Sequence, residues 1–176
     1  MRVKGLPLKD LAIVVSDYLR KNGIESVLTG GACVAIYTKN KYISYDLDFV
    51  LISSEKRKVV RKLLVDAGFY EEGRYFRHHD SAYFLDFIPP PLSIGEEPVK
   101  NIVEIKKRGR TLKLLSPTDC VKDRLAAFYY WKDRQALRQA VLVCQAQDVG
   151  MNEVERWSRK EGMGAPFKIF LDTLRK

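Results

Sequence analysis

The feature that most constrains this chain is an apolar run, Tyr45–Ile52, that contains two aspartates. Both alternating sets of positions in the run are largely apolar, which predicts a strand buried on both faces. Only Asp46 and Asp48 interrupt the pattern. Residues i and i+2 of a strand lie on the same face, about 6.6 Å apart along it. Burying two carboxylates that close together is costly, and a divalent cation held by both would offset the cost. The alternative is that both aspartates lie at the solvated end of the strand.

A strand-to-helix turn precedes this run. The apolar segment Val27–Thr29 predicts a strand, Gly30 and Gly31 follow it, and the apolar residues after them predict a short helix. Glycines let a ligand approach the backbone closely, and the first N–H groups of a helix form an anion site. The pair therefore indicates a phosphate-binding turn, and its alternative interpretation is an ordinary tight turn.

A third carboxylate occurs in a similar setting. Asp86 lies in the apolar run Tyr83–Ile88, which Pro89, Pro90 and Pro91 end because proline cannot donate to a sheet. No other carboxylate of the sequence is embedded in so apolar a strand pattern. Asp46, Asp48 and Asp86 are therefore the candidate catalytic and metal-binding residues.

The rest of the first part predicts alternating helices and strands. The expected elements are an amphipathic helix over 8–21, a helix capped by Ser53 or Ser54 that ends near Ala67, a strand over 74–78, a loop over 94–97, and a hairpin formed by 99–106 and 111–115.

From Ser116 onward the pattern is helical throughout. Ser116, Pro117 and Asp119 form a strong helix start, and a later helix is expected to be capped at Asn152 with Glu155 in the box position. We therefore predict an α+β fold, in which a mixed sheet flanked by helices is followed by a C-terminal helical bundle. The predicted domains are residues 1–115 and 116–176, with the boundary at Ser116.

The composition limits the classes of partner and the cellular location that we expect. The net charge is +9, from 31 Lys and Arg against 22 Asp and Glu, which fits a phosphate-rich partner or, alternatively, a solubilised surface. The sequence has no apolar stretch of about 20 residues, the length that a membrane span needs. The N-terminus lacks an apolar signal core, so we expect a cytoplasmic protein. The three cysteines, Cys33, Cys120 and Cys144, are widely spaced and are expected to be buried free thiols.

The Gly-Gly turn, the Asp-x-Asp strand and a third acidic residue on a separate strand together resemble the nucleotidyltransferase superfamily, which has the DNA polymerase beta-like fold. The helical C-terminal part looks like that of minimal nucleotidyltransferases and of the nucleotidyltransferase toxins of abortive-infection systems. The core of the resemblance covers about residues 27–89. Ala32 departs from the family, in which the residue after the glycine pair is often Ser.

The resemblance implies a reaction and roles for residues. A nucleoside monophosphate would pass from a nucleoside triphosphate to a hydroxyl acceptor, with release of pyrophosphate. Mg²⁺ or Mn²⁺ would be held by the three aspartates, since hard cations prefer oxygen ligands. The expected nucleotide-binding residues are Gly30, Gly31, Lys122, Arg124 and Lys132. An RNA acceptor and a toxin-like role, with an antitoxin-like protein partner, would suit the basic charge.

Three alternatives remain open at this point. A degenerate member of the same fold would bind a nucleotide, a nucleic acid or a protein without catalysis, and Ala32 is compatible with that. A metal-dependent phosphodiesterase or nuclease also uses clustered carboxylates, but usually adds histidine ligands or a catalytic lysine. A basic nucleic-acid-binding module would bind in a salt-dependent way without needing Asp46 or Asp48.

Overall fold

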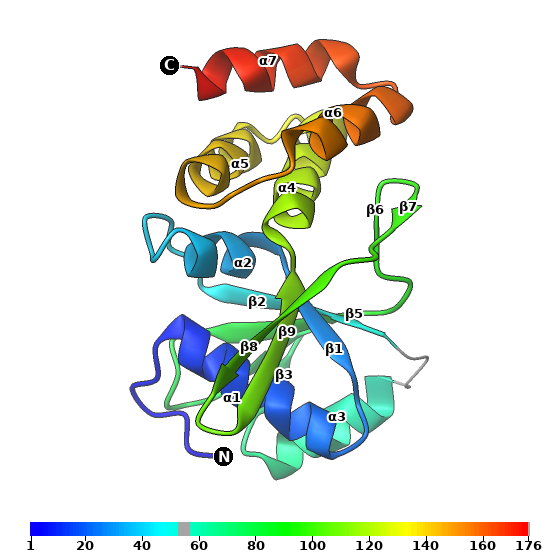
Figure 1. Ribbon diagram of the computed structural model, residues 1–176. Coiled ribbons are helices and arrows are strands. Elements are labelled where there is room, and N and C mark those ends of the chain that lie inside the picture. The colour runs from blue at the N-terminus through cyan, green and yellow to red at the C-terminus, as the bar shows by residue number, and fades with distance from the viewer. Residues whose placement is uncertain (53–56, 176) are drawn as a thin grey trace.

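The computed structural model describes residues 1–52 and 57–175. A sheet-containing part carries the N-terminus, and a stack of helices that ends at the C-terminus lies at its other end (Figure 1). In chain order the elements are α1 (Leu8–Lys21), β1 (Ser26–Thr29), α2 (Gly30–Tyr37), β2 (Asp46–Leu51), α3 (Arg57–Asp66), β3 (Tyr70–Glu72), β4 (Tyr75–Arg77), β5 (Phe84–Ile88), β6 (Ser93–Ile94), β7 (Glu97–Pro98), β8 (Ile102–Lys107), β9 (Arg110–Leu115), α4 (Pro117–Trp131), α5 (Arg134–Ala146), α6 (Met151–Lys160) and α7 (Gly164–Leu174).

The main sheet is mixed and has seven strands in the order β3-β4-β5-β2-β1-β9-β8. Strand β2 pairs in parallel with β5 and antiparallel with β1, and β1 pairs in parallel with β9. The predicted α+β class, a mixed sheet with helices around it and a helical C-terminal part, is confirmed. The division into two domains at Ser116 stays a prediction, although β9 ends at Leu115 and α4 begins at Pro117.

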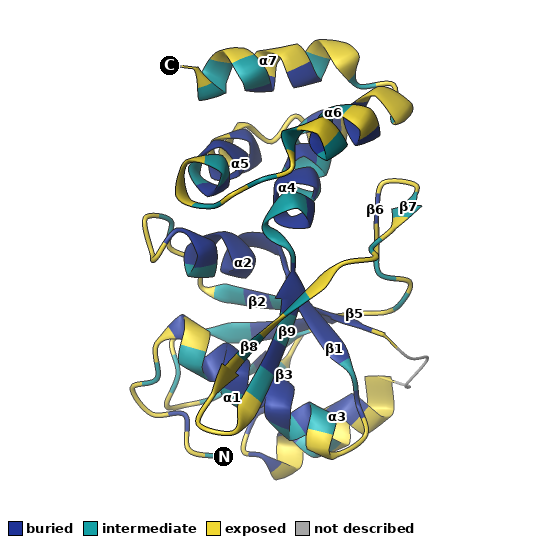
Figure 2. Cartoon of the chain, in the orientation of Figure 1, coloured by how far each residue is buried: buried dark blue, intermediate teal, exposed yellow. Residues whose placement is uncertain are grey.

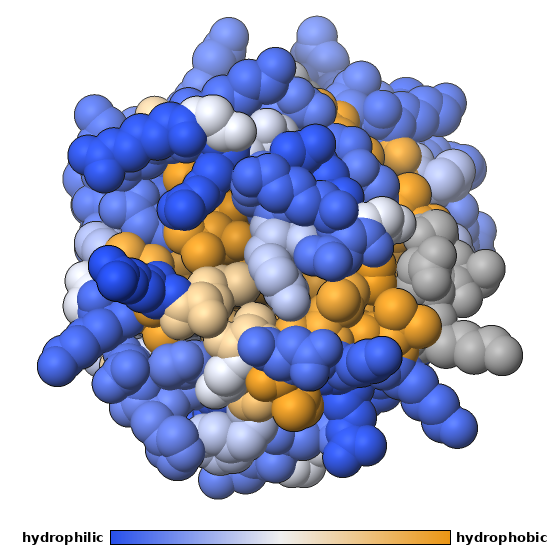
Figure 3. Space-filling model, turned by 90° about the horizontal axis from the view of Figure 1, so that it is seen from below, coloured by the Kyte–Doolittle hydropathy of each residue, from blue (hydrophilic) through white to orange (hydrophobic). Residues whose placement is uncertain are grey.

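Helices α1 and α3 pack side by side, and the hydroxyl of Tyr18 donates to the carbonyl of Leu63 at 3.1 Å. Each helix turns its apolar stripe inward, as Figure 2 shows for α1 and α3, whereas α2 is buried along most of its length. At the end of the molecule opposite α7, hydrophilic side chains surround a smaller apolar area (Figure 3). Helix α2 lies at the centre of the structure, because both the sheet and the later helices cover it.

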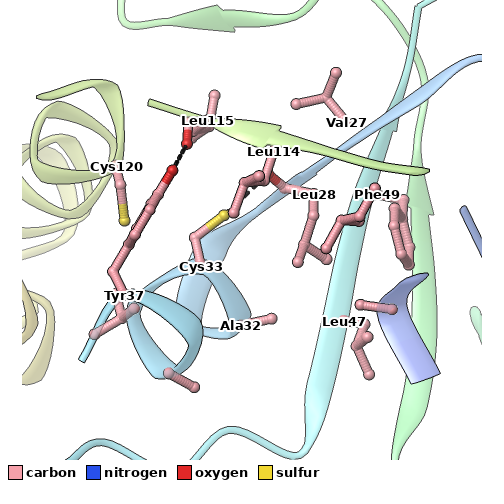
Figure 4. Packing of buried hydrophobic residues seen from close by; sticks show 14 of the residues in the cluster. Val27, Leu28, Ala32, Cys33, Tyr37, Leu47, Phe49, Leu114, Leu115 and Cys120 are labelled. Carbon is pink, nitrogen blue, oxygen red and sulfur yellow. Dashed lines mark hydrogen bonds between the residues drawn. The ribbon is translucent and has the colours of Figure 1, made fainter. Parts of the chain in front are cut away.

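Around α2, side chains of β1, β2, β9 and α4 meet in one core (Figure 4). The hydroxyl of Tyr37 donates to the carbonyl of Leu115 at 2.5 Å, and Cys33 donates to the carbonyl of Leu28 at 3.0 Å. Cys33 and Cys120 are buried, Cys144 is half-buried, and all are free thiols. These contacts attach the last residue of β9, and with it the start of α4, to the helix that follows the glycine pair.

The segment between β5 and β8 leaves the sheet and contacts the helices. Residues 94–97 were expected to be a loop, but they form the turn of a small hairpin, β6–β7. The indole nitrogen of Trp157 donates to the carbonyl of Ile94 at 3.2 Å, and the backbone N–H of Glu96 donates to Glu161 at 3.0 Å. The hairpin therefore connects the sheet to α6.

The helix ends follow local chemistry. Ser116 caps α4 and accepts a hydrogen bond from the Asp119 N–H at 3.1 Å, as predicted. The expected cap of α6 at Asn152 is wrong, because the helix already begins at Met151 after Gly150. Ser53 and Ser54, the expected cap of the helix that precedes Gly68, lie outside the described residues.

The sequence indicated only one strand of the β3–β4 hairpin. The strand expected over 74–78 is β4, and it pairs with β3, which the sequence did not indicate. In the described part of the chain, no helix combines the length and apolar character that crossing a membrane requires.

Candidate functional site

The carboxylates of Asp46, Asp48 and Asp86 meet on one face of two neighbouring strands. Parallel pairing of β2 with β5 places Asp48 directly opposite Asp86, and Asp46 precedes Asp48 by two residues on the same strand. Asp86 is 4% exposed, whereas Asp46 and Asp48 are half-buried. The sequence predicted the alternation on β2, and the register with β5 adds the third carboxylate to the same face.

Negative charge accumulates in this cluster. Burial, followed by repulsion from Asp46 and then from Asp86, raises the pKa of Asp48 to about 7. A cation near these oxygens would relieve that repulsion. The donor set consists of carboxylate oxygens, which are the ligands that Mg²⁺ and Mn²⁺ prefer. The residues therefore fit a hard divalent cation in both charge and chemistry.

The glycine pair lies against these carboxylates. Gly30 has φ +68°, and a Cβ built there would collide with the carboxylate of Asp48. A Cβ at Gly31 would lie 3.0 Å from the Ser44 hydroxyl and 3.3 Å from the ring of Tyr42. A side chain would collide with Asp48 at Gly30 and crowd Ser44 and Tyr42 at Gly31, so glycine lets the first turn of α2 approach Asp48 closely. The assignment of the pair to phosphate binding stays a prediction.

Two of the carboxylates already have partners. The hydroxyl of Ser44 donates to Asp46 Oδ1 at 2.5 Å, and Arg74 Nη2 lies 2.7 Å from Asp86 Oδ2. Within residues 1–52 and 57–175, no three His, Cys, Asp or Glu side chains stand ready in an arrangement that would hold a metal ion. A cation held by all three aspartates would therefore share Asp46 and Asp86 with these partners or displace them.

Similarity to solved structures identifies the fold. No protein-family model and no curated protein matches the sequence. Among solved structures, an antigenic nucleotidyltransferase-like protein from Paracoccidioides brasiliensis superposes with a TM-score of 0.62 at 15% identity, over 81% of this chain and 78% of that one. The chain has a nucleotidyltransferase fold.

Two structures of another protein extend the comparison. ANT(2″)-Ia in complex with adenylyl-2″-tobramycin gives a TM-score of 0.56 at 14% identity, over 88% of this chain and 95% of that one. The solution structure of the antibiotic-resistance factor ANT(2″)-Ia gives 0.55 at 13% identity, over 97% of both chains. The nucleotidyltransferase fold therefore extends over the helical part as well as the sheet.

Within the nucleotidyltransferase fold, α4 brings Arg124 toward the carboxylates. Its guanidinium donates to Asp123 Oδ2 at 2.6 and 2.9 Å and to Gln139 at 3.4 Å, and its charge acts against the raised pKa of Asp48. Burial opposes the charged form of Arg124, but Asp123 outweighs it and keeps the pKa of the guanidinium above its usual value. Arg124 thus places a half-buried, permanently charged guanidinium near Asp48.

The structure does not bring Lys122 or Lys132 to the same place. Lys122 lies about 200° around the helix axis from Arg124, and its ammonium is 3.1 Å from Asp119 and 3.2 Å from Glu153. Lys132 is exposed at the C-terminal end of α4, about 12 Å along the axis from Arg124. Of the three basic residues named from the sequence, only Arg124 lies within electrostatic reach of Asp48.

A cavity lies on the Lys122 side of α4. It measures about 690 Å³ and is lined by residues of β7, α4 and α6, including Glu97, Asp119, Lys122, Glu153 and Arg156. None of the three site aspartates lines it. This cavity is therefore separate from the carboxylate cluster.

Two neighbours of the carboxylates were not indicated by the sequence: Ser44 and Arg74. Both lie in connections between elements rather than in periodic segments. Their only sequence signal is their closeness along the chain to Asp46 or to a strand, which is too weak to identify them.

Proposed function

We propose that this chain is a metal-dependent nucleotidyltransferase that moves a nucleoside monophosphate from a nucleoside triphosphate to a hydroxyl acceptor. The observation that carries the proposal is the cluster of Asp46, Asp48 and Asp86 beside Gly30, in which repulsion and burial raise the pKa of Asp48. Such a cluster costs stability unless a cation uses it. The nucleotidyltransferase fold supports the same assignment independently.

Asp46 and Asp48 would hold Mg²⁺ or Mn²⁺, with Asp86 as a further ligand. When bound, the cation would neutralise charge on the phosphate oxygens that develops in the transition state. The N–H groups at the start of α2, exposed by Gly30 and Gly31, would donate to the triphosphate. Arg124 would add positive charge from the helical side, since a guanidinium binds phosphate with two parallel hydrogen bonds.

The transfer step forms one bond and breaks one bond at the α-phosphorus. The acceptor oxygen forms a bond to the α-phosphorus, and the bond from that phosphorus to the leaving pyrophosphate breaks. The acceptor's hydroxyl proton passes to a carboxylate oxygen, and Asp86 is the aspartate that we assign to this role. Lys122 has no part in the step, because Asp119 and Glu153 bind its ammonium.

For the acceptor we propose RNA, with a toxin-like role and an antitoxin-like protein partner. ANT(2″)-Ia was solved with adenylyl-2″-tobramycin, the adenylylated form of a small molecule that carries several amines. The present chain has a net charge of +9, which repels a polycation and attracts a polyanion. An anionic acceptor therefore suits this chain better than an aminoglycoside.

Binding is tested first, by thermal unfolding with each of the four nucleoside triphosphates, with and without Mg²⁺. A ligand at about 100 times its dissociation constant adds roughly 2.7 kcal/mol of stability. We expect stabilisation that requires nucleotide and metal together and disappears in Asp46→Asn/Asp48→Asn. The control is Asp66→Asn, an exposed aspartate of α3, which should behave as wild type. Lack of any shift at millimolar nucleotide would refute the proposal.

Transfer is tested next, with triphosphates labelled at the α-phosphate and with total RNA or tobramycin as acceptor. Label that becomes attached to RNA supports the proposed acceptor, and label on tobramycin corrects it to a small-molecule hydroxyl. Nucleotide binding without transfer to either would favour the non-catalytic alternative, which Ala32 left open. Labelled RNA must be lost in Asp46→Asn/Asp48→Asn, since otherwise the activity comes from a contaminant.

A further inference from the structure

Arg74 makes an asymmetric ion pair with the third aspartate. Its Nη2 atom lies 2.7 Å from Asp86 Oδ2, and the Asp86 side chain is 6% exposed whereas that of Arg74 is 67% exposed. The carboxylate is therefore fixed in the sheet, while the guanidinium reaches it from solvent. The exposed guanidinium is readily hydrated elsewhere, so it can leave the pair at small cost when another cation takes its place at the buried carboxylate.

The chain positions Arg74 through a tight turn. Arg74 follows Gly73, which has φ +63°, in the two-residue connection between β3 and β4. Its carbonyl accepts from Arg57 Nη2 at 2.8 Å, so the backbone of the turn is held. The guanidinium lies 5.0 Å from the centre of the Tyr75 ring, and Tyr75 contacts Phe84 edge-on at 4.9 Å. The turn thus holds an exposed cation beside the carboxylate cluster.

The two arginines of the site differ in their freedom. Arg124 is 18% exposed, and its guanidinium is bonded to Asp123 and Gln139. Asp86 is the acidic partner of Arg74, and it is also one of the oxygen donors assigned to the cation. A cation that takes Oδ2 of Asp86 would displace Arg74 and leave Oδ1 free to accept a proton, and the displaced guanidinium would stay beside the cluster.

We propose that Arg74 competes with the divalent cation for Asp86 and, once displaced, binds a phosphate of the triphosphate. This inference rests on the proposed function. It makes Arg74 a ligand-binding residue that couples the two substrates: the metal frees the guanidinium, and the guanidinium then retains the nucleotide. Arginine suits the second role because its planar fork binds phosphate through two hydrogen bonds.

The test is Mn²⁺ binding, followed by the electron paramagnetic resonance signal of free Mn²⁺, in wild type and in Arg74→Gln. Removing a competitor whose own side chain is mostly exposed should tighten Mn²⁺ binding about threefold to fivefold. In the presence of Mg²⁺, triphosphate binding to the same variant, measured by calorimetry, should weaken about tenfold, as expected for loss of a charge-assisted hydrogen bond. Opposite changes for metal and nucleotide are the signature of the proposal.

Arg77→Gln is the matched control. Arg77 lies on the same hairpin and over a neighbouring ring, 5.0 Å from the centre of Phe84, but its ionic partner is Glu72. We expect its Mn²⁺ affinity to equal that of wild type. Arg74→Lys keeps the charge without the fork, so it should retain competition with Mn²⁺ but bind triphosphate less well than wild type. Thermal unfolding of each variant verifies that it is folded.

The outcomes separate the two hypotheses. If wild type binds Mn²⁺ in a manner that depends on Asp48, but Arg74→Gln behaves as Arg77→Gln, the inference about Arg74 is wrong and the proposed function stands. If Mn²⁺ binds to none of the proteins, both are wrong. Weaker Mn²⁺ binding in Arg74→Gln would also overturn the inference, because a competitor cannot assist the ligand that it excludes.

Discussion

Helix α4 has a cluster of charged residues on each of two opposite sides, and the two clusters differ in their balance. On the Arg124 side, the aspartates of β2 and β5 repel one another, and burial together with that repulsion raises the pKa of Asp48 to about 7. On the Lys122 side, hydrogen bonds from Arg156 lower the pKa of Glu153 to about 2, and those from Arg156 and then Lys160 lower that of Glu97 to about 2. The first cluster has more carboxylates than cations, and in the second each carboxylate has a basic partner.

The second cluster joins three elements. The ammonium of Lys122 lies between Asp119 and Glu153 and 5.9 Å from the centre of the Trp157 ring. Arg156 binds Glu153 and Glu97, at 2.7 Å in each case, so the network runs from α4 through α6 to the β6–β7 hairpin. Charges that are paired within the fold stabilise it. Charges left unpaired are those available to a ligand, which is why we assign function to the other side.

The largest effect should come from the unbalanced side, in activity. Asp48→Asn should reduce nucleotidyl transfer by about three orders of magnitude, because it removes an assigned metal ligand. It should also raise the melting temperature, because it relieves repulsion from Asp46 and Asp86. Rate measurements and unfolding scans on the same sample check both. A fall in melting temperature would mean that the negative cluster is structural, as the Lys122 cluster is.

On the balanced side, stability should suffer instead. Lys122→Met leaves Asp119 buried without its cation and should cost about 3–5 kcal/mol of the free energy of unfolding. Denaturant unfolding measures the loss, and Lys132→Met at the exposed end of the same helix is the control. Since the two faces of α4 are separate, Mn²⁺ affinity should be unchanged in folded Lys122→Met. A selective loss of Mn²⁺ binding would contradict this separation.

The contact between the glycine pair and the carboxylates predicts a smaller effect. Gly30→Ala should cost about 1–3 kcal/mol, from the left-handed backbone and from the collision with Asp48. Gly109→Ala, with φ +73° and no atom within 4 Å of the added Cβ, carries the backbone strain alone. The difference between the two variants in denaturant unfolding isolates the collision. Equal costs would show that α2 can move away from Asp48.

The smallest effect concerns pH. Hydrogen bonds from Arg156 and then Lys160 lower the pKa of Glu97 to about 2, so its contribution to stability is present above the unfolded-state pKa near 4.5 and is lost as the pH falls toward 2. Glu97→Gln should therefore lower the melting temperature at pH 7 by a few degrees, and the difference should vanish near pH 2. Unfolding scans from pH 7 to pH 2 test this. A difference that persists at pH 2 would mean that packing, rather than charge, connects the hairpin to α6.

Local pattern was enough to predict part of this site. Asp46 and Asp48 interrupt an apolar alternation, Gly30 and Gly31 follow a strand, and each of these features lies within a few residues of sequence. The direct pairing of Asp48 with Asp86 could not be predicted in the same way, because strand register depends on the whole sheet. The fold class was predictable because long periodic segments dominate it.

Other features depend on tertiary contacts that leave no local trace. Lys122 and Arg124 are both basic residues of one helix, and only the rotation of α4 about its axis decides which of them faces the aspartates. Arg74 is an exposed residue of a turn, as many arginines are. The β6 and β7 strands have two residues each, which is too short for any alternation to be recognised.

The hairpin β6–β7 also restricts how the helical part can move relative to the sheet. The helical part is joined to the sheet covalently at Ser116 and again through the Trp157–Ile94 and Arg156–Glu97 contacts. Two separated attachments form a closed frame, and a closed frame resists the hinge bending that a single connection would permit. We therefore expect the distance between Arg124 and the aspartates to change little. Substrate binding should rearrange side chains such as that of Arg74 more than it rearranges α4 relative to the sheet.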